Sequence, residues 1–431
     1  METEQKLDTL QSQFPEVSKD VLLELLVAFD GSVKQTKLML EEQFGPREIK
    51  TEIKTEIKTE IKGKFSGIKR KADSGTTANE YCSLTKKRTF PQRQTSFKVS
   101  KASANISTTL YNKEQIESMV PYLRFYPNFL PNSLADSLLD ELLSKRATFK
   151  DKMFHIAGNE CHSNHQSTVF YDGDIPKQRY DNGFYHNSKY MAQSFTGNIR
   201  TAKFLIEDQA NEVLATTKRH PLQVQSEWRA SLCVGNYFHT NKNNLDWHSD
   251  RLTTIGPLPL ICSLTLGATR IFRIRKQYGE SPIYNIPLPH NSLLLMLPGT
   301  QEEFKHCVPS LGNSLVARHP KANETRINLT LRMSRPHLLN NTPFCPVCKS
   351  AMTLRRMFKK PASRGYYFWL CDGGYHSGKE CPGFYFANLS DIEKPHAKLY
   401  TRDVKHATRW LAEDDHEAKT ATEFHMEDVK D

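Results

Sequence analysis

The chain has 431 residues and a mass of 49.5 kDa, enough for two or three domains and a full-sized enzyme core. Lys and Arg exceed Asp and Glu by 59 to 48, and the net charge of +11 favours a polyanionic partner such as nucleic acid. The start of the chain lacks the basic and apolar pattern of a signal peptide, and no apolar run is long enough to span a bilayer. We therefore expect neither a secreted disulfide-rich protein nor a membrane protein.

Residues 1–45 are predicted to form a small three-helix bundle. Phe14-Pro15 breaks a first helix, an apolar run from Val21 to Phe29 forms a second, and Gly31 ends it. Ser32 then begins a capping-box pattern that opens a third helix. These features resemble a CUE domain, which implies ubiquitin binding. The alternative is a bundle or dimerisation element that does not bind ubiquitin.

Residues 46–118 are predicted to be a long disordered linker, because they are rich in Lys, Thr, Ser and Ile and almost free of aromatic residues. Ile-Lys-Thr-Glu occurs three times in tandem and places Lys50, Lys54 and Lys58 between an apolar residue and an acid. This spacing matches the consensus acceptor for SUMO. The alternative is a slippage repeat that forms a transient helix.

Two basic clusters follow in the same linker, at residues 69–71 and 86–88. Their spacing resembles a bipartite nuclear import signal, which predicts a nuclear protein. Solvated charge without a targeting role is the competing interpretation.

Residues 119–338 are predicted to be the folded core. Apolar and polar runs alternate from Tyr122 onwards, and a Phe129-Leu130-Pro131 segment leads into a helix. Short strand-like segments separated by turns then fill residues 228–335, as in an all-β double sheet.

A candidate metal site begins with the segment Trp247-His248-Ser249-Asp250. His248 and Asp250 are two residues apart, so both side chains point to one face of an extended backbone. His306, which follows an apolar strand, is the natural third ligand. Two His and one carboxylate leave room for a bidentate 2-oxo acid and dioxygen, which suits non-haem Fe(II). An isolated His-x-Asp is more often structural, so the prediction depends on a second motif.

That second motif is the segment from Arg326 to Arg332, which alternates without exception. Arg, Asn, Thr and Arg share one face, and Ile, Leu and Leu share the other. An unpaired buried guanidinium would cost on the order of several kcal/mol, so two inward arginines need an anion. A dicarboxylate such as 2-oxoglutarate supplies one. The alternative is a half-exposed strand whose polar face meets water.

In this order, His-Ser-Asp, a distant His and Arg-x-Asn-x-Thr-x-Arg resemble the signature of the AlkB family of nucleic-acid demethylases over about residues 122–335. The resemblance implies a multidomain protein whose α+β catalytic core is a double-stranded β-helix (jelly-roll) that holds Fe(II). Arg326 would pair the distal carboxylate of 2-oxoglutarate, with Asn328 and Arg332 near its other end and Asn236 as a further co-substrate residue. The implied reaction oxidises a base methyl group in DNA or RNA, releases formaldehyde and belongs to nucleic-acid repair.

The sequence departs from the family pattern where a co-substrate tyrosine is expected two residues after Asn236. This position holds Phe238, and Tyr237 is adjacent. A β-bulge would re-aim Tyr237 toward the co-substrate. On a regular strand, the hydroxyl contact would be missing.

Substrate contacts are predicted between residues 165 and 190, where aromatic side chains could stack a base. The candidates are Tyr171, Asp172, Arg179 and Tyr180. The alternative is that these aromatics pack in the core.

Residues 343–390 are predicted to be a zinc finger. Cys345, Cys348, Cys371 and Cys381 lie close enough in the chain to form a closed tetrahedral zinc site, and His376 could replace Cys381. Disulfides are the competing interpretation.

Residues 345–388 also carry seven Lys or Arg against two acids and many aromatic residues, which suits a single-stranded nucleic-acid binder. Phe368-Trp369-Leu370-Cys371 and Cys381-Pro382-Gly383-Phe384-Tyr385-Phe386 resemble a GRF-type zinc finger, although the first cysteine pair is spaced more widely than usual. Residues 391–431 are expected to be a charged tail.

The sequence therefore favours an Fe(II)/2-oxoglutarate demethylase of single-stranded or damaged DNA, or of RNA. A non-catalytic adaptor between ubiquitin and nucleic acid is the first alternative. An oxygenase that acts on a protein side chain is the second.

Overall fold

The computed structural model describes residues 3–15, isolated positions between Lys19 and Leu40, and residues 107–156, 159–172, 193–311, 317–373 and 381–421. The chain divides into two compact units, Met1–Lys98 and Val99–Asp431. Within the described residues, the helices are all too short or too polar to cross a membrane.

The first unit contains helix α1 (Thr3–Gln13), which buries Leu7 and Leu10. Both side chains join a small apolar cluster with Phe14 and with three leucines from later in the unit, Leu22, Leu26 and Leu40. The described positions between 19 and 40 are helical. The three predicted SUMO acceptors, both basic clusters and the Ser32 cap lie outside the described residues.

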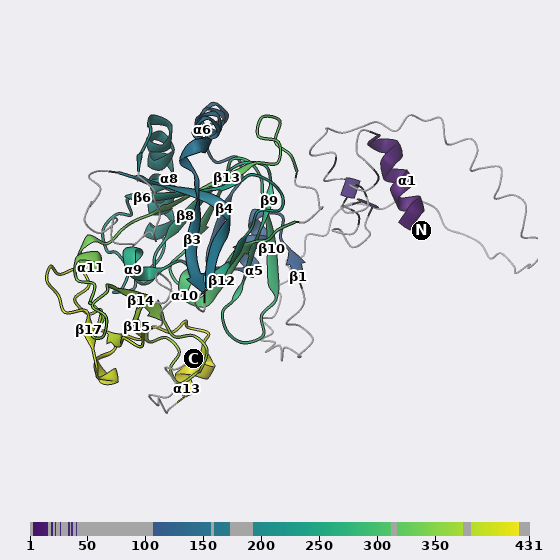
Figure 1. Cartoon of the computed structure of the whole chain (residues 1–431). Coiled ribbons are helices and arrows are strands. Elements are labelled where there is room, and N and C mark those ends of the chain that lie inside the picture. The colour runs from purple at the N-terminus through teal and green to yellow at the C-terminus, as the bar shows by residue number, and fades with distance from the viewer. Residues whose placement is uncertain are drawn as a thin grey trace, which may run out of the picture. The chain divides into compact units, whose positions relative to one another are not determined.

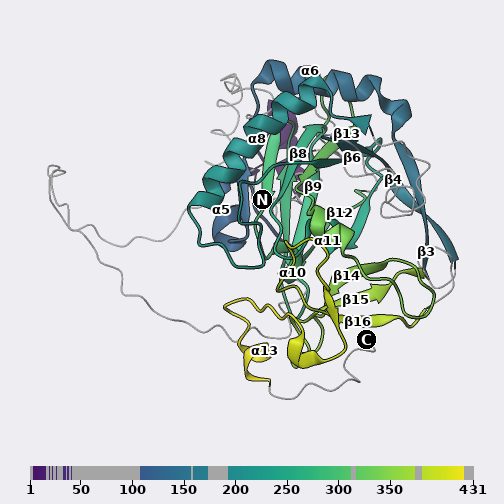
Figure 2. The same cartoon turned by 90° about the vertical axis from the view of Figure 1, so that its left-hand side faces the viewer.

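The larger sheet of the second unit has eight strands, in the order β2-β11-β8-β13-β6-β4-β3 with β5 on β4. Its strands are β2 (Leu123–Tyr126), β3 (Lys150–Ile156), β4 (Asn159–Tyr171), β5 (Gln193–Ser194), β6 (Leu232–Phe238), β8 (Ile261–Gly267), β11 (Ser292–Met296) and β13 (Arg326–Arg332). Helices α6 (Asn132–Ser144) and α8 (Gly197–Ala215) cover one face of it (Figures 1 and 2). Those helices and the sheet enclose the largest apolar cluster of the unit.

A five-stranded sheet in the order β1-β10-β9-β12-β7 lies against the other face. Its strands are β1 (Ser107–Thr109), β7 (Leu245–His248), β9 (Arg270–Lys276), β10 (Ile283–Leu288) and β12 (Phe304–Val308). A second apolar cluster joins the two sheets, with Ile261 and Leu294 from the larger sheet and Ile274 and Phe304 from the smaller. The predicted double sheet is therefore present, and it fits the β-rich core of a 2-oxoglutarate oxygenase.

The side chains of β13 show why the two faces of the larger sheet differ in polarity. Ile327, Leu329 and Leu331 join the apolar cluster under the helices. Arg326, Asn328 and Thr330 are also buried, but they point to the opposite face, between the two sheets. The alternation of the sequence thus puts polar groups in the interior.

Short helices connect the sheets near their ends: α9 (Leu252–Ile255), α10 (Thr300–Glu303) and α11 (Pro336–Asn340). Gly299 precedes α10 with a φ of 98°, and a Cβ there would lie 2.5 Å from Tyr122 Cε1. Glycine is therefore required for the turn that leads from β11 into α10 and β12.

A third sheet, in the order β14-β15-β16-β17, follows the oxygenase-like core. Its strands are β14 (Met352–Arg356), β15 (Tyr367–Cys371), β16 (Phe384–Ala387) and β17 (Tyr400–Thr401). Trp369, Tyr367 and Leu354 of this sheet pack in one cluster with Leu252 and Leu338 of the core. The sheet is thus docked on the core beside α9, α10 and α11 (Figure 2).

Two predicted boundaries differ from the structure. Strand β1 and helix α5 (Lys113–Met119) fall in the predicted linker, where Ile116 is fully buried and anchors α5 on the core. In the predicted tail, β17 and helix α13 (His416–Thr420) are ordered, because Leu399 and Ala418 are buried and Arg364 pairs with Asp415 at 2.9 Å. Both segments contain few apolar residues, so their sequences did not predict these contacts.

Candidate iron and co-substrate site

Two neighbouring strands of the smaller sheet bring the candidate iron ligands together. Strands β7 and β12 are antiparallel, and His248 lies directly opposite His306. Asp250 follows β7 by two residues, and its Oδ1 lies 3.7 Å from His248 Nε2. One ligand atom from each of the three residues lies within 4.8 Å of the others, which is close enough for one metal ion.

The surroundings of both histidine rings suit metal binding. His248 Nδ1 donates to the carbonyl oxygen of Asp246 at 2.7 Å, which leaves the lone pair of Nε2 for a metal. His306 stacks on Phe272, and its Nδ1 has no hydrogen-bond partner among the described residues. Burial lowers the pKa of His248 and lowers that of His306 to about 3, so both rings are neutral near pH 7.

The Asp250 carboxylate is held by charge. Its Oδ2 accepts hydrogen bonds from Arg332 Nε at 2.7 Å and Nη2 at 2.6 Å, while Oδ1 faces His248. Burial, the largest single effect, would raise the pKa of Asp250, but the charge and hydrogen bonds of Arg332 together with the contributions of His306 and His248 hold the pKa at about 2. The backbone N–H of Asp250 donates to the buried Gln301 of α10 at 2.7 Å.

Arg326 lies deeper on the same face of β13 and is 2% exposed. Its Nη2 donates to Thr265 at 3.0 Å, but Nε and Nη1 have no partner among the described residues. Burial and the charge of Arg270 lower its pKa to about 9. A buried cation with two unused donors fits an anionic ligand such as the distal carboxylate of 2-oxoglutarate.

The remaining predicted co-substrate residues lie near this arginine on the same face. Asn328 donates to Ser263 Oγ at 2.8 Å and to the Leu264 carbonyl oxygen at 3.0 Å. Asn236 of β6 lies directly opposite Asn328 and is buried. The predicted set Asn236, Arg326, Asn328 and Arg332 is thus brought together on one face.

Tyr237 is the exception, and its predicted co-substrate role is not supported by the structure. Strand β6 pairs with β13 through seven consecutive residues without a bulge, so Tyr237 points to the helix-covered face. Its ring packs in the large apolar cluster, 5.2 Å from the ring of Phe149. Phe238 faces the interior instead, and its ring lies 5.2 Å from the guanidinium carbon of Arg326.

Arg270 is a second buried arginine that the motif analysis did not assign. Its guanidinium carbon lies 5.6 Å from the Phe238 ring, and its Nη atoms donate to the carbonyl oxygens of Thr240, Asn243 and Pro309. It therefore adds positive charge behind Arg326 without neutralising it. The sequence signal that could have placed Arg270 in the interior is the alternation of the strand from Arg270 to Lys276.

The predicted substrate residues are distributed differently. Tyr171 is buried with Val169 and Leu232 on the face that also holds Arg332. Asp172 pairs with Lys203 of α8 at 3.0 Å. Arg179 and Tyr180 lie outside the described residues.

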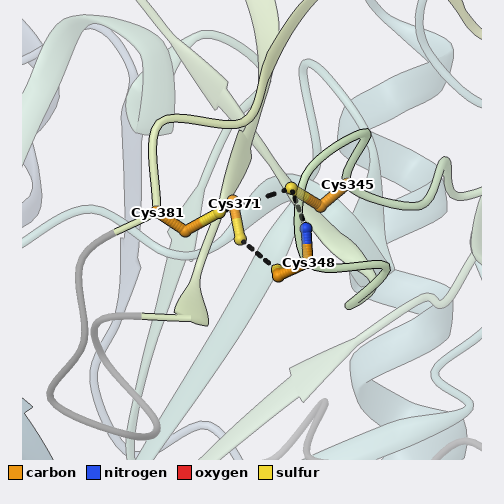
Figure 3. Close-up of side chains that lie close together, drawn as sticks. All are labelled: Cys345, Cys348, Cys371 and Cys381. Atoms are coloured by element: carbon orange, nitrogen blue, oxygen red, sulfur yellow. Dashed lines mark hydrogen bonds between the residues drawn. The ribbon is translucent and has the colours of Figure 1, made fainter.

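The four predicted zinc ligands also converge (Figure 3). The sulfur atoms of Cys345 and Cys381 are 3.5 Å apart, and those of Cys348 and Cys371 are 3.4 Å apart. These distances exceed a disulfide bond but fit four thiolates around one metal ion. The alternative ligand His376 lies outside the described residues.

The cysteine cluster is tied to the iron site through short contacts. Arg251, next to Asp250, donates to Asp372, next to Cys371, at 2.6 Å. Arg356 of β14 donates to the Glu302 carbonyl oxygen at 2.6 Å and pairs with Glu303 at 3.1 Å. Helix α10 thus contacts both the third sheet and the iron site, because its Gln301 also accepts the N–H of Asp250.

Comparisons with known proteins show which family this chain resembles. The family model described as 2OG-Fe(II) oxygenase superfamily matches residues 122–332. Alpha-ketoglutarate-dependent dioxygenase alkB homolog 3 of Bos taurus is 38% identical over 109 residues, which are 23% of this chain and 35% of that protein. Its Homo sapiens counterpart is 37% identical over 109 residues, with coverages of 23% and 35%.

The DNA oxidative demethylase ALKBH2 of Arabidopsis thaliana is 30% identical over 109 residues, or 20% of this chain and 32% of that protein. The chain thus spans about a third of the length of these curated relatives. A solved structure titled "The structure of OsALKBH1" covers 49% of this chain and 98% of its own, at 15% identity and a TM-score of 0.33. Residues 122–332 therefore match the 2OG-Fe(II) oxygenase superfamily, and the chain is similar to AlkB homologues over 109 residues.

Proposed function

We propose that this protein removes methyl groups oxidatively from bases of DNA or RNA, with decarboxylation of 2-oxoglutarate and release of formaldehyde. One observation carries the proposal: Arg326 is a buried arginine with two unused donors, on the inner face that also holds His248, Asp250 and His306. An anionic co-substrate fits the buried arginine, and a metal fits the two histidines and the carboxylate.

In this proposal, His248, Asp250 and His306 hold Fe(II), which supplies the oxidising chemistry when it is bound with 2-oxoglutarate and dioxygen. Arg326 binds the distal carboxylate of the co-substrate. Arg332 keeps Asp250 ionised and oriented, because its two bonds to this aspartate both go to the same carboxylate oxygen, Oδ2. The other oxygen, Oδ1, then faces His248 and the metal position.

Two observations support a nucleic-acid substrate. One relative is named a DNA oxidative demethylase, and the chain carries a net charge of +11. The converging cysteines support a structural zinc ion in a GRF-like finger. Ubiquitin binding by residues 1–45, SUMO conjugation and nuclear import stay predictions from the sequence.

The test is a turnover assay with a panel of methylated DNA and RNA oligonucleotides, Fe(II), 2-oxoglutarate and oxygen. We expect formaldehyde and succinate in equal amounts, and no product from His248→Ala. A matched control is His290→Ala, which removes a half-buried histidine outside the site. If the wild type bound iron and 2-oxoglutarate but demethylated none of the oligonucleotides, the nucleic-acid substrate would be wrong and a protein side chain would be tested next.

A further inference from the structure

The outer face of the smaller sheet carries a basic and aromatic surface. Side chains alternate along a strand, so Trp247 and Lys305 point outward while their neighbours His248 and His306 point toward the metal position. We call this surface the outer patch. It consists of Trp247 of β7, Arg273 and Arg275 of β9, Lys305 of β12, and Phe358 and Lys359 after β14.

The outer patch is continuous across the oxygenase core and the finger. Lys305 lies directly opposite Arg275 on neighbouring strands. The guanidinium of Arg275 lies 4.5 Å from the Trp247 ring, and Lys305 Nζ lies 5.1 Å from the ring of Phe358. Two domains therefore build one surface.

The cations of the outer patch lack acidic partners. Among the described residues, Arg273, Arg275, Lys305 and Lys359 form no ion pair with a carboxylate. Lys276, next along β9, shows the contrast, because it pairs with Asp414 at 2.7 Å. Burial, followed by the charges of Arg275 and Lys359, lowers the pKa of Lys305, so the cations repel one another.

The aromatic rings already have partners. Trp247 lies under Arg275, and Phe358 lies under Lys305, so neither ring needs a base to stack on it. Arg273 donates through Nε to Asn285 at 2.8 Å, and this bond does not use its Nη groups. What the surface offers is therefore a row of oriented cations, which suits phosphates more than bases.

We propose that the outer patch binds the sugar-phosphate backbone of the nucleic-acid strand that carries the target base. The proposal rests on the proposed function for the identity of the partner. Binding there would be independent of base sequence and sensitive to salt, because it would come from the release of counterions around phosphates. It would also hold the strand on the sheet that carries the candidate iron ligands.

The test compares two double variants that each remove two positive charges. Arg275→Gln/Lys305→Gln lies in the outer patch, and Lys218→Gln/Lys321→Gln removes two exposed lysines elsewhere. Affinity for a fluorescent single-stranded oligonucleotide is measured by anisotropy over a range of KCl concentrations. We expect the patch variant to bind about tenfold more weakly and to lose about 1.4 from the salt slope, or about 0.7 per phosphate contact. The control should keep both its affinity and its slope.

A charge-conserving variant, Arg275→Lys/Lys305→Arg, separates charge from folding and should bind nearly as well as the wild type. Melting temperature and Co(II) titration check that each variant is folded. If the patch variant bound the oligonucleotide as tightly as the wild type and still demethylated it, the proposed role of the outer patch would be wrong, and the proposed function would stand. If binding depended on the patch but the wild type demethylated no oligonucleotide, the role of the outer patch would stand and the proposed function would be wrong. If the wild type bound no oligonucleotide, both would fall.

Discussion

Among its described residues, the core contains two clusters with the same side chains, two histidines and one aspartate, and only one of the two is built for a metal. The second cluster is Asp136, His290 and His319, whose potential ligand atoms also lie within 4.8 Å of one another. Composition and distance therefore do not distinguish it from His248, Asp250 and His306.

The difference lies in the second nitrogen of each ring. In the second cluster, His290 Nδ1 accepts a hydrogen bond from the Gly267 N–H at 3.0 Å. His319 Nδ1 accepts from the N–H groups of Lys321 at 3.2 Å and Ala322 at 3.3 Å. A neutral imidazole that accepts at Nδ1 carries its proton on Nε2, so Nε2 has no lone pair for a metal. His248 has the reverse arrangement, because its Nδ1 donates to a carbonyl oxygen.

The carboxylates differ as well. The Asp250 side chain is 9% exposed and is fixed by Arg332, whereas the Asp136 side chain is 50% exposed and lies 3.8 Å from His290. A metal site is therefore recognised by the hydrogen bonds and charges that orient its ligands, not by ligand types alone.

The largest expected effect separates the two clusters directly. His248→Ala should weaken Co(II) or Mn(II) binding at the iron site by at least about 100-fold, because losing even an outer partner of a ligand costs about 10- to 100-fold. His290→Ala should leave that affinity within about twofold. Metal titration followed by absorbance or calorimetry measures both. Equal losses in the two variants would mean that the second cluster also binds the metal or supports the site.

The next effect concerns the co-substrate. Arg326→Gln removes a buried charge whose Nε and Nη1 donors are unused in the described structure. The Kd for 2-oxoglutarate should rise roughly 10- to 100-fold, because a hydrogen bond to a charged group contributes about 1.5 to 3 kcal/mol. Calorimetry with Mn(II) in place of Fe(II) measures this without turnover. The exposed Arg318, paired with Glu324, supplies the control Arg318→Gln. An unchanged Kd for Arg326→Gln would contradict the assigned carboxylate contact.

A smaller effect tests the link between the finger and the iron site. Arg251→Gln breaks the 2.6 Å bond to Asp372 and should weaken metal binding at the iron site roughly three- to tenfold, because Arg251 is one step removed from Asp250. Arg355→Gln removes a bond to the same Asp372 carboxylate from within the finger and is the matched control. Co(II) titration and measured zinc content report on the two sites separately. Similar losses in both variants would show that Asp372 acts through the fold of the finger instead.

The sequence predicted most of the candidate site because its signals are local. The His-x-Asp spacing and the alternation of Arg326 to Arg332 each follow from strand geometry, and the register of β13 with β6 and β8 agrees with them. The orientation of Tyr237 was left open because a bulge depends on the pairing of two strands. The docking of the third sheet on the core through Arg251 and Arg356 was not predictable either, because residue pairs so far apart in the sequence form no local motif.

The smallest effect is a pH dependence that the second cluster adds to that of the buried His248 and His306. Burial lowers the pKa of both His290 and His319, and both rings serve as acceptors only when neutral. Unfolded histidine titrates near about pH 6.5, so stability is fully present above that pH and is lost as the pH falls toward the lower folded pKa. His290→Asn keeps an acceptor for Gly267 but cannot be protonated.

The metal-free His290→Asn variant should therefore lose less melting temperature than the wild type between pH 7.5 and 5.5, by on the order of one or two degrees. The effect is small because both rings are partly exposed and because Asp136, Asp140 and Lys321 lie nearby with opposing charges. His396→Asn, at an exposed position, should follow the wild-type curve. If His290→Asn also followed the wild-type curve, the ring would not be held neutral by its backbone contact, and the distinction between the two clusters would lose its physical basis.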